Sequence, residues 1–162
     1  MTFALARAGR RRAAGVTLAE LLVVVAIMGF FLLISIPAAA NYLRAAKVRT
    51  AADGLVKDLQ SARYIAVTTR VVRTVTLSSA VPAQGYSFVN VRGQTISRVL
   101  PDTVTIDTAS NFPVTFTLLG GLLGSPATCT VRGRITPSRS HLYTITVGAT
   151  GKVDKTYDFN QP

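Results

Sequence analysis

The first seventy residues follow a helical pattern whose character changes halfway. Residues 21–40 contain no charged side chain, and as a helix this run would be about 30 Å long, close to one hydrocarbon thickness. Further on, apolar residues recur at steps of three and four up to about Thr68, which is typical of an amphipathic helix packed on a domain. That stripe comprises Val48, Ala52, Leu55, Leu59, Ala62 and Ala66. We expect one helix from Val16, with Pro37 weakening or kinking it.

After Thr69 the pattern becomes alternating and rich in β-branched residues, which predicts strands. Glycine, proline, asparagine, aspartate and serine separate the runs, and Thr150-Gly151 predicts a hairpin turn between the last two. Short connections favour an antiparallel meander, with the helix stripe covering one sheet face. The predicted fold class is therefore α+β. The expected strands are Val71–Ser78, Tyr86–Val91, Thr95–Val99, Val104–Asp107, Val114–Leu119, Ala127–Ile135, Leu142–Val147 and Lys152–Tyr157.

The charge distribution predicts which end of the chain stays in the cytoplasm. The chain has a formal net charge of +11, and its first fifteen residues contain four arginines and no acid. Such a cluster stays in the cytoplasm while the rest is exported. The net positive charge of the domain is compatible with binding to nucleic acid, to anionic lipid or to an acidic partner, and it does not indicate which of these is bound. The single cysteine, Cys129, cannot form an internal disulfide; a buried core thiol is favoured over a reactive one.

The informative motif spans Gly15 to Glu20, with the sequence GVTLAE directly before the apolar run. It resembles the class III signal of type IV prepilins and pseudopilins. The resemblance implies that a prepilin peptidase removes residues 1–15, cutting between Gly15 and Val16, and methylates the new amino group of Val16. Phe or Met is usual at that first position, so Val16 departs from the pattern. Residues 16–40 would then be the transmembrane half of the helix.

Glu20 is the only acid between Met1 and Tyr42, and ionisation is costly at the start of an apolar helix. A cleaved chain would offer the α-ammonium of Val16 as a cation, in the same chain or in a neighbour. The resemblance implies assembly through that second contact; the alternative is a glutamate favoured by the helix dipole. Gly29 and Pro37 fit a helix that loosens in a filament, or simply tolerate kinks.

A conventional secretory signal is the rival interpretation of the N-terminus. Ala38-Ala39-Ala40 satisfies a small-x-small cleavage rule and would release a soluble domain beginning at Asn41. The apolar run is longer than such signals usually have. This interpretation also leaves the spacing between Gly15 and Glu20 unexplained.

Later segments resemble the GspH/FimT minor pilins: Leu59–Arg63 followed by Ala66, Arg70 and VTL, then VTFTLLG, and finally YTITVGATGKVDKT. This resemblance implies a pilin-like fold with two sheets packed on the helix, and residues 41–162 as a periplasmic domain near a filament tip. The protein would be a single-pass inner-membrane subunit of a type II secretion pseudopilus or a type IV pilus. Its partners would be other pilins, prepilin peptidase, an inner-membrane assembly platform and membrane lipid.

DNA binding in natural transformation is the alternative function, since some FimT-type members bind DNA through a Gly-Arg-x-Arg stretch. Here Gly151-Lys152-Val153-Asp154 matches it, with an acid replacing the second arginine, which weakens phosphate attraction. The possible DNA contacts are Arg132, Arg134, Arg139, Lys152 and Lys155. Few aromatic residues are interleaved among them, so solvated surface charge is favoured.

Enzymatic chemistry has little support in the sequence. His141 is the only histidine, expected in a loop before the strand at Leu142, and Ser138 and Ser140 have no acid–base partners in sequence. A glycine-rich phosphate loop is also missing from the pattern. The sequence therefore predicts no catalytic site, no metal and no cofactor.

Overall fold

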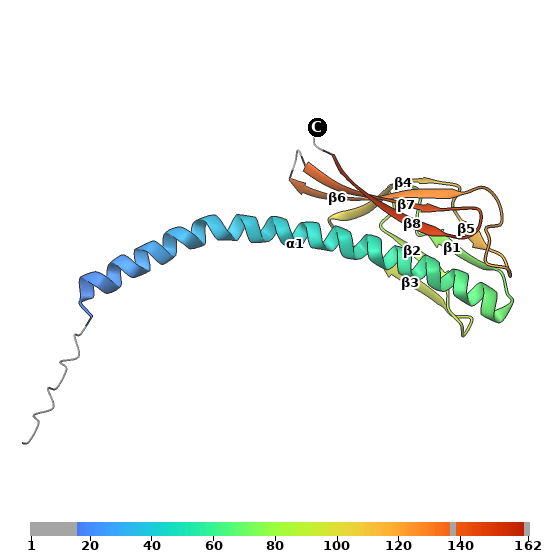
Figure 1. Cartoon of the computed structure of the whole chain (residues 1–162), viewed down its shortest axis with the longest axis horizontal. Coiled ribbons are helices and arrows are strands. Elements are labelled where there is room, and N and C mark those ends of the chain that lie inside the picture. Colours follow the sequence, from blue (N-terminus) through green and yellow to red (C-terminus); the bar gives the residue numbers. More distant parts are fainter. Residues whose placement is uncertain (1–15, 137–138, 161–162) are drawn as a thin grey trace, which may run out of the picture. The chain divides into compact units, whose positions relative to one another are not determined.

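The computed structural model describes residues 16–136 and 139–160. The expected leader, including Gly15, lies outside them. The chain divides into two compact units, Met1–Ala38 and Ala39–Pro162. A single helix, α1 (Leu18–Thr69), supplies the described helix of both units (Figure 1). It begins two residues later than predicted and continues past Pro37, so the proline does not end it.

The helical segment of the first unit exposes its apolar side chains. From Leu21 to Leu33 the large apolar residues are 48–74% exposed. Within the described residues, the structure contains no helix both long enough and apolar enough to cross a membrane.

Among the described residues of the second unit, eight antiparallel strands follow and form two four-stranded sheets (Figure 1). The first sheet has the order β3-β2-β1-β5 and the second the order β4-β6-β7-β8. All eight strands were predicted, with ends that differ by one to three residues in most cases. Their bounds are β1 Arg73–Leu77, β2 Gly85–Val89, β3 Thr95–Val99, β4 Val104–Ser110, β5 Val114–Phe116, β6 Ala127–Thr136, β7 Arg139–Val147 and β8 Val153–Asn160.

The expected meander is wrong at β5. This strand pairs with β1 in the first sheet, whereas β4 and β6, which flank it in sequence, pair with each other in the second. The chain turns out of β4 at Asn111, which has a positive φ of 58° and donates from its side chain to the Pro126 carbonyl at 2.7 Å. Val114 and Phe116 can then be buried in the core.

The predicted helix stripe is confirmed as the α1 side of the core. Its six residues are all 1% exposed or less. Across from it, Val131, Ile145 and Val147 of the second sheet are equally buried. The approach is closest at Gly133, where an added Cβ would lie 1.8 Å from Val48 Cγ2. Only glycine therefore allows β6 to pack this near to the helix.

The predicted hairpin between β7 and β8 is also confirmed. The Gly148 N–H donates to the Lys152 carbonyl, and the Gly151 N–H donates to the Gly148 carbonyl, each at 2.8 Å. Gly151 has a φ of +76°, a conformation that glycine adopts without the strain of a side chain. Val147 and Val153 are the first paired residues after this turn.

Candidate functional site

The N-terminal turn of α1 is built around Thr17 and Glu20. The Thr17 backbone N–H and hydroxyl donate to Glu20 Oε2 at 3.3 and 3.4 Å, and the Glu20 N–H donates to Thr17 Oγ1 at 3.2 Å. This reciprocal arrangement is a capping box, which satisfies donors that a helix start leaves unpaired. It explains why α1 begins at Leu18 rather than at Val16.

The capping box gives Glu20 a role within its own chain, as the helix-start interpretation expects. It leaves the carboxylate exposed, and no cation forms an ion pair with it in the described part of this chain. Sequence reasoning missed Thr17. The signal was present, because Thr followed three residues later by Glu before an apolar run predicts such a cap. Val16, just before the helix, is 74% exposed.

Gly29 has open space around it. No atom outside its own helix and its chain neighbours lies within 4 Å of a Cβ built on it. Packing within the chain therefore does not require glycine there. The expected role of Gly29 and Pro37 in helix flexibility stays a prediction.

The basic residues proposed as DNA contacts are not gathered on one surface. Arg132 and Arg134 alternate with the buried Val131 and Gly133 along β6, so they share the face that points away from the core. Lys155 lies on the other face of the second sheet, because its register partner is the buried Ile145.

Three of these five residues form ion pairs in the same domain. Arg132 Nη1 lies 3.3 Å from Asp107 Oδ2, and Lys152 Nζ lies 2.9 Å from Asp154 Oδ1. Lys155 forms an ion pair with Asp53. Arg139 begins β7, and its side chain lies outside the described part. These pairs reduce the positive charge available to a phosphate backbone.

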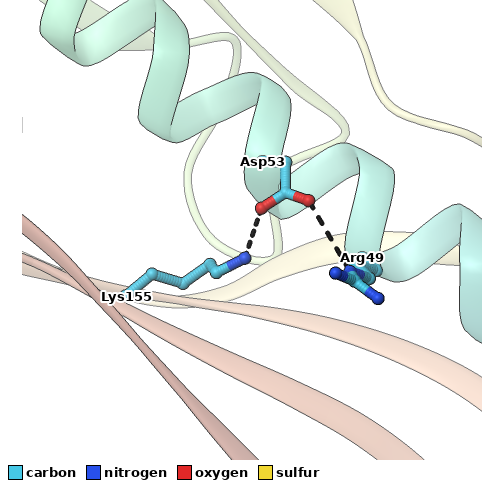
Figure 2. A network of polar contacts seen from close by, with 3 residues as sticks. All are labelled: Arg49, Asp53 and Lys155. Atoms are coloured by element: carbon cyan, nitrogen blue, oxygen red, sulfur yellow. Dashed lines mark hydrogen bonds and ion pairs between the residues drawn. The ribbon is translucent and has the colours of Figure 1, made fainter.

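Lys155 connects the second sheet to the helix. Figure 2 shows its ammonium reaching from β8 to the Asp53 carboxylate on α1, with Arg49 one helical turn away on the other carboxylate oxygen. The Arg49 Nε to Asp53 Oδ2 distance is 3.9 Å. Lys155 Nζ also lies 5.3 Å from the centre of the Tyr143 ring. The residue therefore has a structural function that its position in the sequence did not indicate.

Two further polar residues of α1 tie the helix to other parts of the second unit. Asp58 accepts from the Tyr86 hydroxyl at 2.8 Å and from Arg98 Nε at 3.2 Å, which links α1 to β2 and β3. Burial and the Asp58 contact raise the pKa of Tyr86 above its ordinary value. Arg63 donates to the Gly120 and Thr150 carbonyls at 2.9 and 3.2 Å. Sequence reasoning gave Asp58 no role and used Arg63 only as part of the Leu59–Arg63 segment that resembles the GspH/FimT minor pilins.

Cys129 is 1% exposed, which confirms the expected core thiol. Its burial raises its pKa to about 12, so the reactive thiolate is suppressed.

The loop predicted for His141 is wrong, because β7 starts at Arg139 and pairs His141 with Phe159 of β8. His141 Nδ1 and the Tyr157 hydroxyl are 2.5 Å apart, and their rings stack with centres 5.5 Å apart. Burial lowers the pKa of His141.

The larger of two described surface clefts measures about 400 Å³ and is lined by residues without a titratable side chain, between the end of β1 and the segment from Ala109 to Pro113. The other, of about 330 Å³, includes Tyr86 and Arg98. Among the described residues, no group of three His, Cys, Asp or Glu is placed to hold a metal ion.

Comparison with known proteins yields one family motif and a set of similar folds. Residues 10–36 match the family described as the prokaryotic N-terminal methylation motif. No curated protein matches the chain in sequence.

The minor pseudopilin EpsH from the type 2 secretion system of Vibrio cholerae is similar in structure, with a TM-score of 0.54 and 12% identity over 68% of this chain and 97% of that one. The type IV minor pilin FimU of Pseudomonas aeruginosa gives 0.53 and 19% over 70% and 97%. A second crystal form of FimU gives 0.54 over 74% of this chain. At these identities the likeness establishes the fold.

Proposed function

We propose that the chain, which carries a prokaryotic N-terminal methylation motif and has a pilin-like fold, is a type IV pilin-like minor subunit assembled near the tip of a type II secretion pseudopilus or a type IV pilus. Its role is non-enzymatic and consists of binding other subunits. The observation that carries the proposal is the exposed Glu20 carboxylate, which lies within the matched motif at the start of an exposed apolar helix.

The proposed mechanism begins with removal of the leader after Gly15. This step creates an α-ammonium group on Val16, which has an ordinary pKa of about 8 and is therefore largely charged at neutral pH. Inside a filament, Glu20 pairs with this group on a neighbouring subunit. The contact fixes the axial offset between subunits, and the apolar side chains from Leu21 to Leu33 pack on other helices. Before assembly the same segment holds the protein at the inner membrane, with the domain in the periplasm.

Replacing Glu20 with Ala, Leu or Gln tests this mechanism. Each variant should be exported and held at the membrane, because the leader arginines and the apolar run remain, yet should fail to enter filaments. The measurement is cross-linking or co-purification with the other pilins of the same organism, together with secretion or DNA uptake. N-terminal sequencing of the mature protein should find Val16; finding Asn41 would support the secretory-signal interpretation.

The capping box provides a matched control. Thr17→Val removes the hydroxyl that completes the cap and leaves the Glu20 charge in place. If Glu20 acts only as a cap, Thr17→Val and Glu20→Ala should reduce incorporation equally, each through loss of about 1 kcal/mol of helix stability, and Glu20→Gln should assemble nearly as wild type, because Gln also completes a capping box. If Glu20 acts through its charge, Thr17→Val should assemble nearly as wild type. Normal incorporation of all three Glu20 variants would require the mechanism to be abandoned.

The two filament systems differ in their cargo, and the fold is compatible with both, since its neighbours include one subunit of each. Deletion of the gene in its own organism separates them. Loss of an exported enzyme would place the protein in type II secretion, whereas loss of twitching or transformation would place it in a type IV pilus.

A further inference from the structure

An exposed apolar cluster lies where α1 ends and the connection between β5 and β6 passes it. Leu119 is 93% exposed, Leu123 68% and Leu118 47%, and Val67, Val71 and Val72 are each between 43% and 48% exposed. The two parts are contiguous, since a Cβ on Gly120 would meet Val67 Cγ2 at 2.9 Å. We call these six residues the leucine-turn patch. Contiguous exposed apolar side chains of this kind mark binding sites more often than other parts of a protein surface do.

The patch is held in place by hydrogen bonds. Leu118 and Leu119 are the central residues of a turn closed by the Gly120 N–H donating to the Thr117 carbonyl at 2.9 Å. The Thr117 N–H donates to the Gly121 carbonyl, and the Leu123 N–H to the Thr115 carbonyl, each at 2.8 Å. Arg63 fixes Gly120 from the helix. Leucine is not a usual turn residue, and a rigid turn that presents two leucines to solvent is pre-organised for binding.

The surroundings of the patch are positively charged. Arg63, Arg70 and Arg73 lie in or beside it, and the sequence has no carboxylate between residues 59 and 101 or between residues 108 and 153. None of these three arginines forms an ion pair within the part of the chain that the structure describes. The Arg73 Nε atom is buried and makes no hydrogen bond there. Such an atom usually has a partner.

Arg70 adds a second, independent observation. It directly follows α1 and has a φ of 52°, a left-handed conformation. Glycine is the usual residue at this position after a helix, and a residue with a Cβ costs roughly 1 kcal/mol more there. An arginine is therefore kept at the edge of the patch in a strained conformation, which favours a role for its charge.

We propose that the leucine-turn patch is the docking surface for a different protein, one that presents carboxylates around apolar side chains. A second copy of this chain is a poor occupant, because two identical patches would bring their arginines together. An anionic lipid surface would also suit apolar and cationic groups. The protein occupant is favoured by the fixed turn, and its identification as another pilin-like subunit rests on the proposed function.

The test uses the full-length chain in its own organism, with a photo-crosslinking benzophenone amino acid at position 119. Position 99 provides the matched control, since Val99 on β3 is an apolar side chain 84% exposed, away from the patch. Each prepilin-type protein of the organism is co-expressed in turn with the labelled chain. We expect an adduct at position 119 with one of them, through a peptide that contains Asp or Glu, and no such adduct at position 99.

Charge-reversal variants test whether the adduct at position 119 depends on the positive charge beside the patch. Arg70→Glu should lower the yield of this adduct about tenfold or more, because it opposes the partner's carboxylates. Replacing the cross-linked carboxylate of the partner with Arg should restore it. Leu119→Asp should abolish binding, whereas Val99→Asp should leave it unchanged. Circular dichroism of the purified variants confirms that they are folded.

Several results would overturn the proposal: adducts with lipid only, adducts with a second copy only, equal yields at positions 119 and 99, or no dependence on Arg70. Failure here is distinguishable from failure of the proposed function. A chain that enters filaments in a Glu20-dependent way but gives no adduct at position 119 lacks this docking surface and remains a filament subunit. A chain whose Glu20 variants assemble normally contradicts the proposed mechanism whatever position 119 shows.

Discussion

At the scale of single residues, two acids of α1, Asp53 and Asp58, connect the helix to the strands. Asp58 contacts Tyr86 of β2 and Arg98 of β3, and Asp53 forms an ion pair with Lys155 of β8. The two sites differ in solvent access, since the Asp58 side chain is 14% exposed and the Asp53 side chain 37%. Screening by water therefore weakens the Asp53 pair more than the Asp58 contacts.

This difference predicts unequal effects of the same substitution. Asp58→Asn should lower the free energy of unfolding by about 1–3 kcal/mol, because it weakens hydrogen bonds to a charged, partly buried group. Asp53→Asn should lower it by less than about 1 kcal/mol. Urea denaturation of a chain shortened to begin near Arg44, expected to be soluble and monomeric, measures both. Equal losses, or a larger loss at Asp53, would contradict the assignment.

The Cys129 thiol should be protected from chemical modification. With a pKa near 12 in the folded domain against an ordinary value of 9.0, it stays protonated at pH 8 and is buried as well. A thiol reagent at pH 8 should label the folded domain slowly and the urea-unfolded domain rapidly, with Cys129→Ser as the unlabelled control. Rapid labelling without denaturant would show that the thiol is reactive.

The same shift has a consequence at alkaline pH. A pKa raised on folding means that the contribution to stability is complete below about pH 9 and is lost as pH rises toward 12. Tyr86, whose pKa is also raised, acts in the same direction. The alkaline loss of stability should therefore be smaller in Cys129→Ala than in the wild-type domain.

At the scale of elements, periodic segments were predictable and pairings between distant segments were not. The stripe from Val48 to Ala66 was identified because burial repeats with the helix period, and the strands because alternation marks them. The pairing of β5 with β1 was missed, since three residues carry no signal for which of two sheets they join. The bond from Lys155 to Asp53 spans 102 residues of sequence, so only the folded chain reveals it.

Within the candidate site, too, residues with a local sequence signal were predicted and the spatial relations between residues were not. Glu20 was recognisable from its neighbours in sequence, yet its capping partner Thr17 was overlooked because the carboxylate was considered only as a charge. Among the five basic residues, Lys152 was proposed from the Gly-Arg-x-Arg resemblance, and the others were grouped with it because of their charge. Strand alternation then separates them: Arg132 and Arg134 lie on one face of the second sheet and Lys155 on the other.

The contact between α1 and β6 should depend on Gly133. Gly133→Ala should destabilise the domain by about 1–3 kcal/mol, because its Cβ overlaps the Val48 side chain. Val48→Ala should remove the overlap, so the double variant should be more stable than the sum of the single losses predicts, by about 0.5–3 kcal/mol. Urea denaturation of the four chains gives this coupling.

Gly54, a glycine on α1, is the control for the substitution of Gly133 on β6. An added Cβ at Gly54 would meet only the Tyr86 hydroxyl, at 3.8 Å. Gly54→Ala should therefore be neutral or stabilising by up to about 1 kcal/mol, as expected for alanine in a helix. Additive losses at Gly133 and Val48, or a loss at Gly54 as large as that at Gly133, would mean that α1 and β6 do not meet in this way.

At the scale of the whole molecule, the question is whether a net charge of +11 makes this chain a DNA-binding protein. That net figure already subtracts the seven carboxylates, and four of the arginines that it counts lie in residues 1–15, so the positive charge is spread along the chain. Lys152, Lys155 and Arg132 are paired with carboxylates, and the arginines beside the leucine-turn patch are assigned here to a protein partner. Net charge alone produces weak association that does not distinguish sequences.

We therefore expect the shortened chain to bind duplex DNA weakly, with affinity that falls steeply as salt rises and little preference for sequence. Fluorescence anisotropy over a salt series measures this. Lys152→Ala with Lys155→Ala should change affinity little, and no more than Arg132→Ala with Arg134→Ala, because both lysines are held by aspartates within the domain. The opposite outcome is tight binding that the lysine pair of substitutions abolishes and the arginine pair leaves intact. It would mean that the hairpin between β7 and β8 captures DNA despite Asp154, and DNA capture would become the leading function.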